Sequence, residues 1–590
     1  MLPISYGEAN FENLRRRGSF YLDKTRFIPL AEQVEKFFFI RPRRFGKSLW
    51  ISILSYYYDI NSANKFEELF HDLYIQKHPT KLKNSYLTLY MNFSGIYGRT
   101  YEEVQRAFDS SVYFKIRTFL SQYKKILGEN ACNEFSSTYQ TLSSTSMIDF
   151  LLDRVKDTPY KIYVLIDEYD HFVNTLVSEG KDSFVEQMIN RSGFVRSFYE
   201  QLKIGSDCGI MDRFFITGVS PIMLDELSSG FNIMSNMSTN LEFNEMLGFT
   251  EEEVLSMLDS LPEKCFSCKD KKFVFEDLLY YYNGYKFHPE AQKKLFNSDM
   301  VLYFFQSFRE GGRYPEEILD LNVKTDYGKL KGLIVGSGGK EQLREIIEEL
   351  ATEKTLQFRL VRRFTFENRL NEDELKSLLY FFGLLTMTDT PNYFKVPNYV
   401  IQQLHWEYLQ KFLQEKGVEF KIGLFGKAIA DMAERGDVEK LKEITIDFFH
   451  NRLSSFDFAG LSEKHIKFFY ISYFTFTNLY NVISEREISE RKRIDILLEA
   501  HPAFYNYVKY NFIIELKYIK KTDSEEIAKQ KREEAISQAK EYYEIYKKDF
   551  NQFGRELRSI AIIVTYTREV EFIEVSGFEE FFTGKDKDSN

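Results

Sequence analysis

Residues 41–48 read Arg-Pro-Arg-Arg-Phe-Gly-Lys-Ser, and these residue types can bind a nucleoside triphosphate. A phosphate-binding loop requires a glycine, four residues, and then Gly-Lys-Ser or Gly-Lys-Thr, and here Arg41 replaces the first glycine. Gly46 lets the backbone approach a phosphate, Lys47 would reach the β- and γ-phosphates, and Ser48 would bind Mg²⁺. Because Arg41 stands where glycine is expected, the sequence does not decide whether the loop has the usual curvature. The alternative interpretation of these residues is a basic turn before a helix.

Two later apolar stretches end in residues that suit the same site. The first ends in Asp167 and Glu168, which would hold the Mg²⁺ shell and orient the attacking water. The second contains Thr217, which could sense the γ-phosphate or could equally well cap a turn. The order of these motifs favours nucleotide binding over a strand that ends in solvated acids. The predicted ATP-binding residues are Arg43, Arg44, Phe45, Gly46, Lys47, Ser48, Asp167 and Thr217.

A second group of charged residues lies near the C-terminus and comprises Glu485, Asp495, Glu515 and Lys517. Side chains two apart on a strand share a face, so Glu515 and Lys517 point the same way, and a hairpin would bring Asp495 beside them. Two carboxylates and the carbonyl of Leu516 then form a hard-oxygen site for Mg²⁺. Lys517 could orient a water that attacks phosphorus, with the metal stabilising the charge that develops.

Gln538 and Tyr542 are four residues apart on the next predicted helix, so they share a face and could close this site. The alternative is a structural hairpin with alternating charges. The apolar neighbours of Asp495 and Glu515 argue against this alternative. Positive charge after the site fits a phosphodiester substrate, although the solvated face of a charged helix explains it equally well. The basic residues concerned are Lys517, Lys520, Lys521, Lys529, Lys531 and Arg532.

The nucleotide motifs require a sheet whose strands run parallel. In the first 249 residues, short apolar stretches alternate with segments long enough for helices, a pattern that predicts a parallel α/β sheet. Ligands of such sheets bind at the carboxyl ends of the strands, where the motifs lie. The predicted strands are residues 37–40, 86–93, 162–166 and 214–219.

Residues 250–455 are predicted to be mainly helical. Residues 250–253, Thr-Glu-Glu-Glu, read as a capping box that opens a helix. A helix, a two-strand hairpin and a helix between about 373 and 401 are compatible with a winged-helix unit, although any hairpin among helices gives this pattern. Residues 456–590 are predicted as a helix, two strands, a charged helix and a last strand, with the strands at 493–499, 512–519 and 560–566.

The composition is that of a globular protein, with 44% hydrophobic and 28% charged residues. A net charge of −10 argues against a surface that binds nucleic acid everywhere and leaves room for a local basic channel. No apolar run is long enough to span a membrane, and residues 1–24 lack the apolar core of a signal peptide. Cys265 and Cys268 form a C-x-x-C without two further ligands, so a reduced, cytoplasmic protein is expected.

The chain resembles a bacterial AAA-ATPase-like family that carries a C-terminal PD-(D/E)xK nuclease domain. The family implies an ATPase core with a helical lid and makes Arg41 a family trait. It usually has glycine where this chain has Lys492, a departure that loosens the register of that strand. The resemblance rests on residues 20–25, 41–48, 165–170, 215–221, 228–232 and 282–287, and then on 484–485, 493–495, 515–517 and 535–542.

The expected fold is therefore α/β. An AAA-like P-loop NTPase sheet occupies residues 1–249, and a helical lid and connector, compatible with a winged helix, occupies 250–455. A small restriction-endonuclease-like α/β domain occupies 456–590.

The expected function is Mg²⁺-dependent cleavage of nucleic acid. Binding and hydrolysis of ATP are expected to regulate this cleavage. DNA is favoured over RNA as the partner, no membrane is expected, and homo-oligomerisation is left open. The alternative is an ATP-dependent switch or scaffold whose C-terminal domain binds nucleic acid or a partner without cleavage. The sequence identifies no arginine finger, for which Arg191 and Arg196 are candidates. The expected catalytic residues are Glu168, Asp495, Glu515 and Lys517, and the expected Mg²⁺ ligands are Ser48, Asp167, Glu485, Asp495 and Glu515.

Overall fold

The structure is a computed structural model of the 590-residue chain. It describes residues 3–139, 143–189, 192–222, 233–267, 269–320, 339–352, 355–362, 370–415, 422–452, 462–475, 477–489, 492–550 and 554–575, with residues 324, 328, 332, 334 and 364. The chain divides into two compact units, Met1–Arg313 with Ile318–Gln402, and Tyr314–Glu317 with Gln403–Asn590. The predicted middle region contributes to both units, and the predicted boundaries at 249 and 455 stay predictions.

The first unit contains a five-stranded sheet in the order β2-β3-β4-β1-β5, in which every pair of neighbours is parallel. The four predicted strands form its body, because each is an apolar run that can be buried on both faces. The short strand β5 was not predicted. The strands are β1 (Lys36–Ile40), β2 (Tyr86–Asn92), β3 (Lys161–Asp167), β4 (Met211–Gly218) and β5 (Ser235–Asn236).

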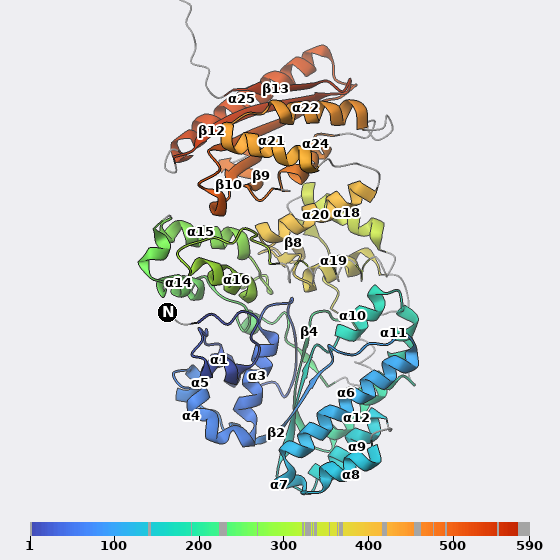
Figure 1. The fold of residues 1–590 in the computed structure, drawn as a ribbon. Helices are drawn as coiled ribbons and strands as arrows, with labels where there is room; N and C mark the ends of the chain where they lie inside the picture. Colours follow the sequence, from blue (N-terminus) through green and yellow to red (C-terminus); the bar gives the residue numbers. More distant parts are fainter. Residues whose placement is uncertain are drawn as a thin grey trace, which may run out of the picture. The chain divides into compact units, whose positions relative to one another are not determined.

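Helices cover both faces of this sheet (Figure 1). Helix α3 packs on β2 and β3 on one side, with α1 and α4 beyond it, while α6 and α12 pack on β2 and β4 with α9 behind them. The strand that precedes the phosphate loop, β1, is separated from β3 by β4 alone. The helices are α1 (Phe11–Arg16), α3 (Lys47–Tyr58), α4 (Phe66–Leu69), α6 (Tyr101–Gln122), α8 (Ala131–Tyr139), α9 (Ser144–Val155), α10 (His171–Ser178), α11 (Asp182–Ile189) and α12 (Phe194–Asp207).

The rest of the first unit is mainly helical, as predicted. Thr250 caps α14 with the predicted capping box, in which its hydroxyl accepts from Glu253 and the Glu253 carboxylate accepts from Thr250. A small sheet in the order β6-β8-β7 follows, in which the predicted hairpin gains the additional strand β6. The elements are α14 (Glu251–Asp259), α15 (Lys271–Tyr282), α16 (Ser298–Phe308), α18 (Lys340–Thr352), β6 (Leu356–Gln357), α19 (Glu372–Phe381), β7 (Thr386–Met387) and β8 (Tyr393–Lys395). Helix α20 (Tyr399–Glu415) begins in the first unit and continues into the second.

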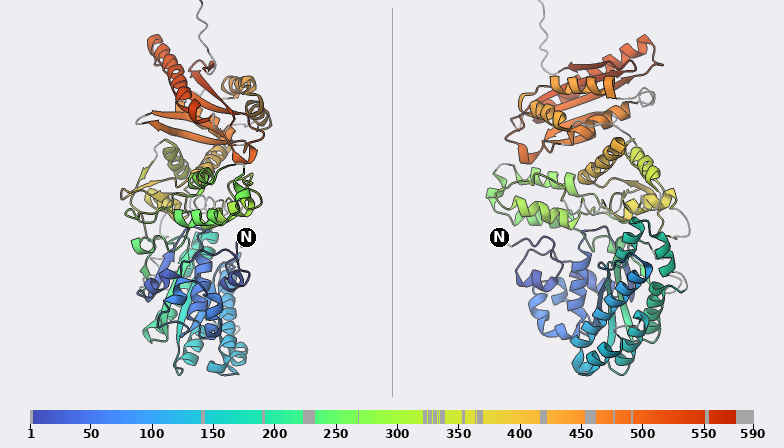
Figure 2. Two further views of the ribbon diagram at one scale, coloured as in Figure 1. Left: turned by 90° about the vertical axis from the view of Figure 1, so that its left-hand side faces the viewer. Right: turned by 45° about the vertical axis from the view of Figure 1, so that its right-hand side comes forward.

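The second unit is built on a mixed sheet in the order β13-β12-β11-β10-β9, in which only β11 and β12 are parallel. Helix α25 covers one face, and α21, α22 and α24 lie on the other (Figure 2). Strands β9 and β13 were not predicted. The elements are α21 (Ile422–Arg435), α22 (Glu439–Asp447), α24 (Glu463–Phe474), β9 (Tyr480–Ser489), β10 (Lys492–Ala500), β11 (Tyr510–Ile519), α25 (Glu525–Phe550), β12 (Glu556–Thr565) and β13 (Val570–Glu574).

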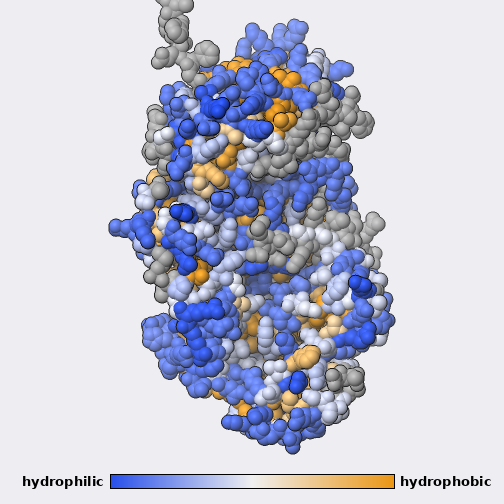
Figure 3. Space-filling view, viewed as in Figure 1, coloured by the Kyte–Doolittle hydropathy of each residue, from blue (hydrophilic) through white to orange (hydrophobic). Residues whose placement is uncertain are grey.

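Figure 3 shows one face of the surface, where hydrophilic residues predominate and apolar residues form scattered patches. Among the described helices, none combines the length and the apolar character that crossing a membrane requires.

Candidate functional site

The phosphate-loop residues connect β1 directly to α3. Gly46 takes a left-handed backbone conformation, with φ +89°, as the residue before α3, and the space beside its Cα is open. A side chain here would be strained, and its absence leaves the backbone accessible. Lys47 is buried, and its Nζ donates to the carbonyls of Arg41 and Pro42 at 3.0 Å each. Burial lowers the pKa of Lys47, while the negative charges of Glu168 and Asp167 oppose this effect.

Arg41, the residue in place of the first glycine, is an internal anchor. It is 1% exposed, and its guanidinium donates to the carbonyls of Ser238 at 2.5 Å and Phe243 at 3.0 Å. The guanidinium also lies 4.0 Å from the ring centroid of Phe39 and 3.9 Å from that of Phe287. Burial lowers the pKa of Arg41 to about 9. The side chain of Arg41 thus anchors the start of the loop to the segment that contains Ser238 and Phe243.

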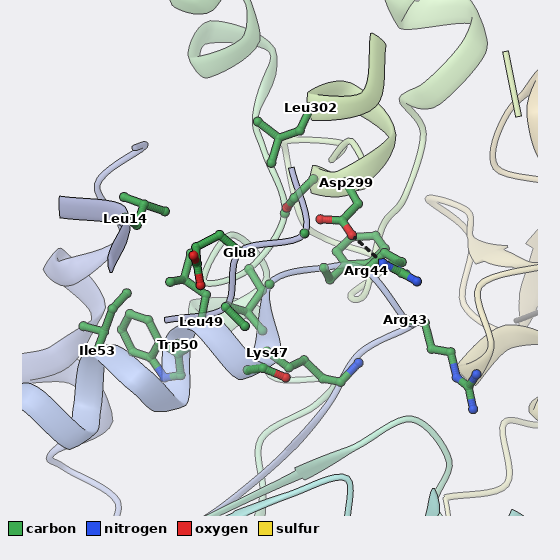
Figure 4. A pocket seen from close by; sticks show the side chains of 18 of the residues that line it. Glu8, Leu14, Arg43, Arg44, Lys47, Leu49, Trp50, Ile53, Asp299 and Leu302 are labelled. Atoms are coloured by element: carbon green, nitrogen blue, oxygen red, sulfur yellow. Dashed lines mark hydrogen bonds and ion pairs between the residues drawn. The ribbon is translucent and has the colours of Figure 1, made fainter. Parts of the chain in front are cut away.

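The loop is also attached to the start of α16. Asn297 donates from Nδ2 to the carbonyl of Arg43 at 3.1 Å, and the N–H of Asp299 donates to the carbonyl of Arg44 at 3.2 Å. The side chains of Arg44 and Asp299 form an ion pair at 3.2 Å, drawn as a dashed line in Figure 4. Phe45 is 1% exposed and packs edge-on against Tyr285 and Phe287. Each residue from Arg43 to Phe45 therefore touches the helical region.

Asp167 and Glu168 lie where β3 ends. Asp167 is fully buried, and Asn92 on the neighbouring strand donates to its Oδ2 at 3.4 Å. Burial raises the pKa of Asp167 to about 6, although a hydrogen bond from Ser48 opposes the rise. Glu168 is half-buried and takes a left-handed φ of +53°, which is strained for a residue other than glycine. The structure thus brings Ser48, Asp167 and Lys47 together.

Thr217 lies beside the loop strand with its hydroxyl already bonded. It is fully buried, and its Oγ1 donates to the carbonyl of Phe39 on β1. This bond supports the structural interpretation of Thr217 over the γ-phosphate sensor.

Asp170, which sequence reasoning did not identify, accepts from the N–H groups of Val219 at 3.1 Å and Ser220 at 2.7 Å. It ties the ends of β3 and β4 together.

A pocket of about 450 Å³ adjoins the loop. In Figure 4 the basic side chains of Arg43 and Arg44 lie at one end and the apolar side chains of Leu14, Trp50 and Ile53 at the other. A nucleotide has this same division into phosphates and base. Three segments that were not predicted as site residues also line the pocket, through residues 5 and 7–9, residues 20–22 and 24, and residues 247–249. The only sequence signal for them was the family likeness of residues 20–25.

The C-terminal carboxylates lie side by side on an antiparallel pair of strands. Ile496 on β10 lies opposite Ile514 on β11, so the next pair outward is Asp495 and Glu515. Glu515 accepts from the N–H of Asp495 at 3.2 Å, and Asp495 accepts from the N–H of Leu516 at 3.0 Å. Glu515 is 2% exposed. Burial, and then the neighbouring Asp495, raises the pKa of Glu515 well above its ordinary range.

Two lysines and a further glutamate surround this pair. Lys517 is on the same strand as Glu515, and its charge opposes the rise of the Glu515 pKa. Lys467 on α24 approaches Asp495 at 3.3 Å. Glu463, at the start of α24, lies 3.7 Å from Lys517, and burial raises its pKa with a smaller contribution from Asp495. Glu463 was missed because it lies 32 residues before Asp495 in sequence and follows no pattern.

The other predicted residues of this site fall on neighbouring elements. Tyr542 is on α25, and burial raises its pKa to about 12, with smaller contributions from the charges of Glu515 and Asp495. Gln538, one turn earlier on α25, buries its Oε1 with no hydrogen-bond partner. The backbone of Glu485 lies in β9, but its side chain is outside the described residues. The described residues contain no cluster of three or more His, Cys, Asp or Glu side chains able to hold a metal.

The predicted departure at Lys492 has a structural counterpart, because the pairing of β10 with β9 shifts register between Lys492 and Arg493. Part of the predicted basic cluster is paired with acidic residues. Lys531 pairs with Asp523 at 2.6 Å, and Arg532 pairs with Glu571 at 2.8 Å. These two residues therefore support the solvated-helix interpretation.

Two remaining predictions concern isolated residues. Arg196 pairs with Glu200 on its own helix at 2.9 Å. Arg191 and Cys268 lie outside the described residues.

Comparison with known proteins gives matches in both units. Residues 5–228 match a family described as a predicted AAA-ATPase, and residues 461–571 match the PD-(D/E)XK nuclease superfamily. An uncharacterized protein from the vnfD 5′ region of Azotobacter chroococcum mcd 1 is 26% identical over 313 residues, which is 51% of each chain. The chain thus spans about half the length of this curated relative. Cdc6p from Pyrobaculum aerophilum aligns over 70% of this chain and 96% of its own, with 12% identity and a TM-score of 0.24.

The two family matches agree with the geometry of the two regions. The first covers the parallel sheet with its phosphate loop, and the second covers the mixed sheet with its paired carboxylates. The chain therefore combines an AAA-ATPase-like region with a C-terminal region of the PD-(D/E)XK nuclease superfamily.

Proposed function

We propose that the chain binds ATP in its first unit and that nucleotide binding controls Mg²⁺-dependent cleavage of nucleic acid by its second unit. The observation that carries the proposal is the pairing of the buried Glu515 with the partly buried Asp495, with Lys517 on the strand of Glu515. Two carboxylates held this close repel each other unless a proton or a cation lies between them. Such a pair is costly in a structural hairpin and useful in a metal site.

The donor set fits Mg²⁺, which prefers oxygen ligands. Asp495 and Glu515 would hold the ion, and the buried Oε1 of Gln538, which has no partner, could accept from a water nearby. A bound Mg²⁺ would supply an acidified water and would stabilise charge on the phosphate oxygens. Lys517 would orient the water through its ammonium group. Glu463, 3.7 Å from Lys517, would position that lysine.

The first unit supports ATP binding through its loop. Gly46 leaves the backbone open, and the amides at the start of α3 would bind the phosphates. Lys47 now donates to two carbonyls of the loop and could donate to β- and γ-phosphate oxygens instead. Ser48 and Asp167 would hold Mg²⁺, and Glu168 would orient the attacking water for hydrolysis. Control of the nuclease is inferred from the presence of both regions on one chain.

The test is cleavage of plasmid DNA and of RNA by the full chain, with Mg²⁺ or with EDTA, and with or without ATP. We expect cleavage only with Mg²⁺, loss of cleavage in Glu515→Gln, and a changed response to ATP in Lys47→Ala. Glu556→Gln is the matched control, because Glu556 is an exposed glutamate at the start of β12. Wild-type protein that cleaves neither polymer would exclude the nuclease activity.

A second candidate function is an ATP-dependent switch or scaffold whose second unit binds without cleaving. The observation in its favour is that the described residues contain no group of three or more His, Cys, Asp or Glu side chains placed to hold a metal ion. In that case Mg²⁺ would change neither cleavage nor the melting of the second unit. Nucleic-acid binding would then persist in Glu515→Gln.

A further inference from the structure

Two short hairpins lie side by side in the helical region of the first unit. In the first, Tyr285 and Leu295 exchange both backbone hydrogen bonds, at 3.0 and 2.8 Å. The second is the pair β7 and β8, in which Thr386 lies opposite Lys395. Lys286 joins the two, because its N–H donates to the hydroxyl of Thr386 at 2.7 Å and its carbonyl accepts from the N–H of Met387 at 3.3 Å.

This arrangement gathers three lysines. Lys286 follows Tyr285 and Lys294 precedes Leu295, so the two lysines lie opposite each other, and Lys395 is on the far strand of the second hairpin. Lys286 is 7% exposed at its side chain, and its Nζ donates to the carbonyl of Pro289 at 2.6 Å and to the carboxylate of Asp389. Asp389 is 87% exposed.

The negative charge of Asp389 thus interacts with the ammonium groups of all three lysines. The pKa of Asp389 is lowered first by Lys286 and then by Lys294 and Lys395. Burial lowers the pKa of Lys395, and the charges of Lys294 and Lys286 lower it further. The local excess of positive charge contrasts with the net charge of −10 of the whole chain. Such mutual repulsion is relieved when an anion binds among the lysines.

We propose that Lys286, Lys294 and Lys395 form a binding site for the phosphodiester backbone of nucleic acid, outside the carboxylate centre. The proposal rests on the proposed function, which supplies nucleic acid as the ligand. The three lysines come from neighbouring strands, but only Lys294 is exposed and Lys395 partly exposed, while the Lys286 side chain is 7% exposed beside them. Lys294 and Lys395 are therefore the accessible cations of the site, and Lys286 adds positive charge behind them. Cations at the surface suit a polymer backbone better than a small enclosed anion, and backbone contacts position a protein without reading sequence.

The test measures binding of a fluorescent DNA duplex to the full chain by anisotropy, in EDTA and in an Asp495→Asn background, so that no cleavage occurs. We expect Lys294→Gln and Lys395→Gln each to weaken binding severalfold and to reduce the slope of log affinity against log salt by about 1. Asp389→Asn should strengthen binding, because it removes the competing carboxylate. Lys293→Gln is the matched control, since Lys293 is the sequence neighbour of Lys294 and pairs with Glu252 at 3.1 Å.

The proposal is overturned if Lys294→Gln and Lys395→Gln bind like Lys293→Gln, or if wild-type protein does not bind the duplex. Preferential binding to anionic lipid vesicles, with no binding to DNA, would also overturn it.

A different set of results would contradict the proposed function. A wild-type protein that binds DNA through these lysines but never cleaves it with Mg²⁺ contradicts the nuclease alone, and cleavage that the lysine variants leave unchanged contradicts this site alone.

Discussion

Replacing Arg41 with glycine would restore the usual phosphate-loop pattern, and yet we expect Arg41→Gly to destabilise the first unit. The substitution removes the guanidinium that bonds the carbonyls of Ser238 and Phe243. It also removes the cation that lies between the rings of Phe39 and Phe287. Glycine itself adds freedom to the unfolded chain.

The magnitude follows from these contacts. A buried carbonyl left without a donor costs about 1–3 kcal/mol, and a desolvated cation–π contact is worth about 1–2 kcal/mol. Burial lowers the pKa of Arg41, so keeping its guanidinium charged inside the folded unit costs free energy. The substitution removes this desolvation cost, which offsets part of the lost stability. A net destabilisation of about 3 kcal/mol remains. Unfolding entropy is about 2.1 cal/mol/K per residue, so a unit of roughly 400 residues should melt about 4 °C lower.

Thermal melts of the full chain, followed by calorimetry so that the transitions of the two units can be separated, provide the measurement. Arg44→Gly is the matched control, because Arg44 has a φ of +70° that glycine adopts without strain, and its side chain is 30% exposed. We expect that variant to melt closer to the wild type than Arg41→Gly does, because it loses only the partly exposed ion pair with Asp299. If Arg41→Gly melts no lower than Arg44→Gly, Arg41 is not an anchor and the reasoning fails.

Three further outcomes are expected. Lys47→Ala should lose ATP binding in titration calorimetry, whereas Glu168→Gln should bind ATP and hydrolyse it slowly; unchanged affinity in a folded Lys47→Ala protein would contradict the nucleotide site. Asp495→Ala should reduce cleavage by orders of magnitude in a gel assay without lowering the metal-free melting temperature, and a stability loss without any wild-type cleavage would indicate a structural hairpin. In EDTA, melting of the second unit should fall as the pH rises above 4.5, because folded Glu515 keeps a proton that the unfolded chain releases; Glu515→Gln should flatten this dependence, and an unchanged slope would contradict the raised pKa.

The parallel sheet could be predicted because its strands are apolar runs set between helix-length segments. The hairpin that brings Asp495 beside Glu515 was also predicted, since both acids lie on short strands among apolar neighbours. These features depend on periodicity over a few residues, which the sequence displays directly.

Contacts between distant segments could not be predicted in the same way. Arg41 looks like a defect in a motif until Ser238 and Phe243, about 200 residues further along the chain, supply carbonyls for its guanidinium. For Thr217 the sequence left a γ-phosphate sensor and a capping residue equally open, and the tertiary structure adds that Phe39 on the neighbouring strand β1 accepts its hydrogen bond. In each case the partner is set by the tertiary structure, and no local pattern encodes it.

The mixed pairing of the C-terminal sheet has a consequence for the order of folding. Asp495 and Glu515 are 20 residues apart and meet in an antiparallel pair, which needs little loop closure. Strand β12 pairs in parallel with β11 and can be added only after the 26-residue helix α25 crosses over. Local pairings form faster than distant ones, so we expect the acids to meet early and α25 to cover them late. The repulsion between the acids then acts on the first step of folding, and the protonation state of one carboxylate pair should influence how fast the second unit forms.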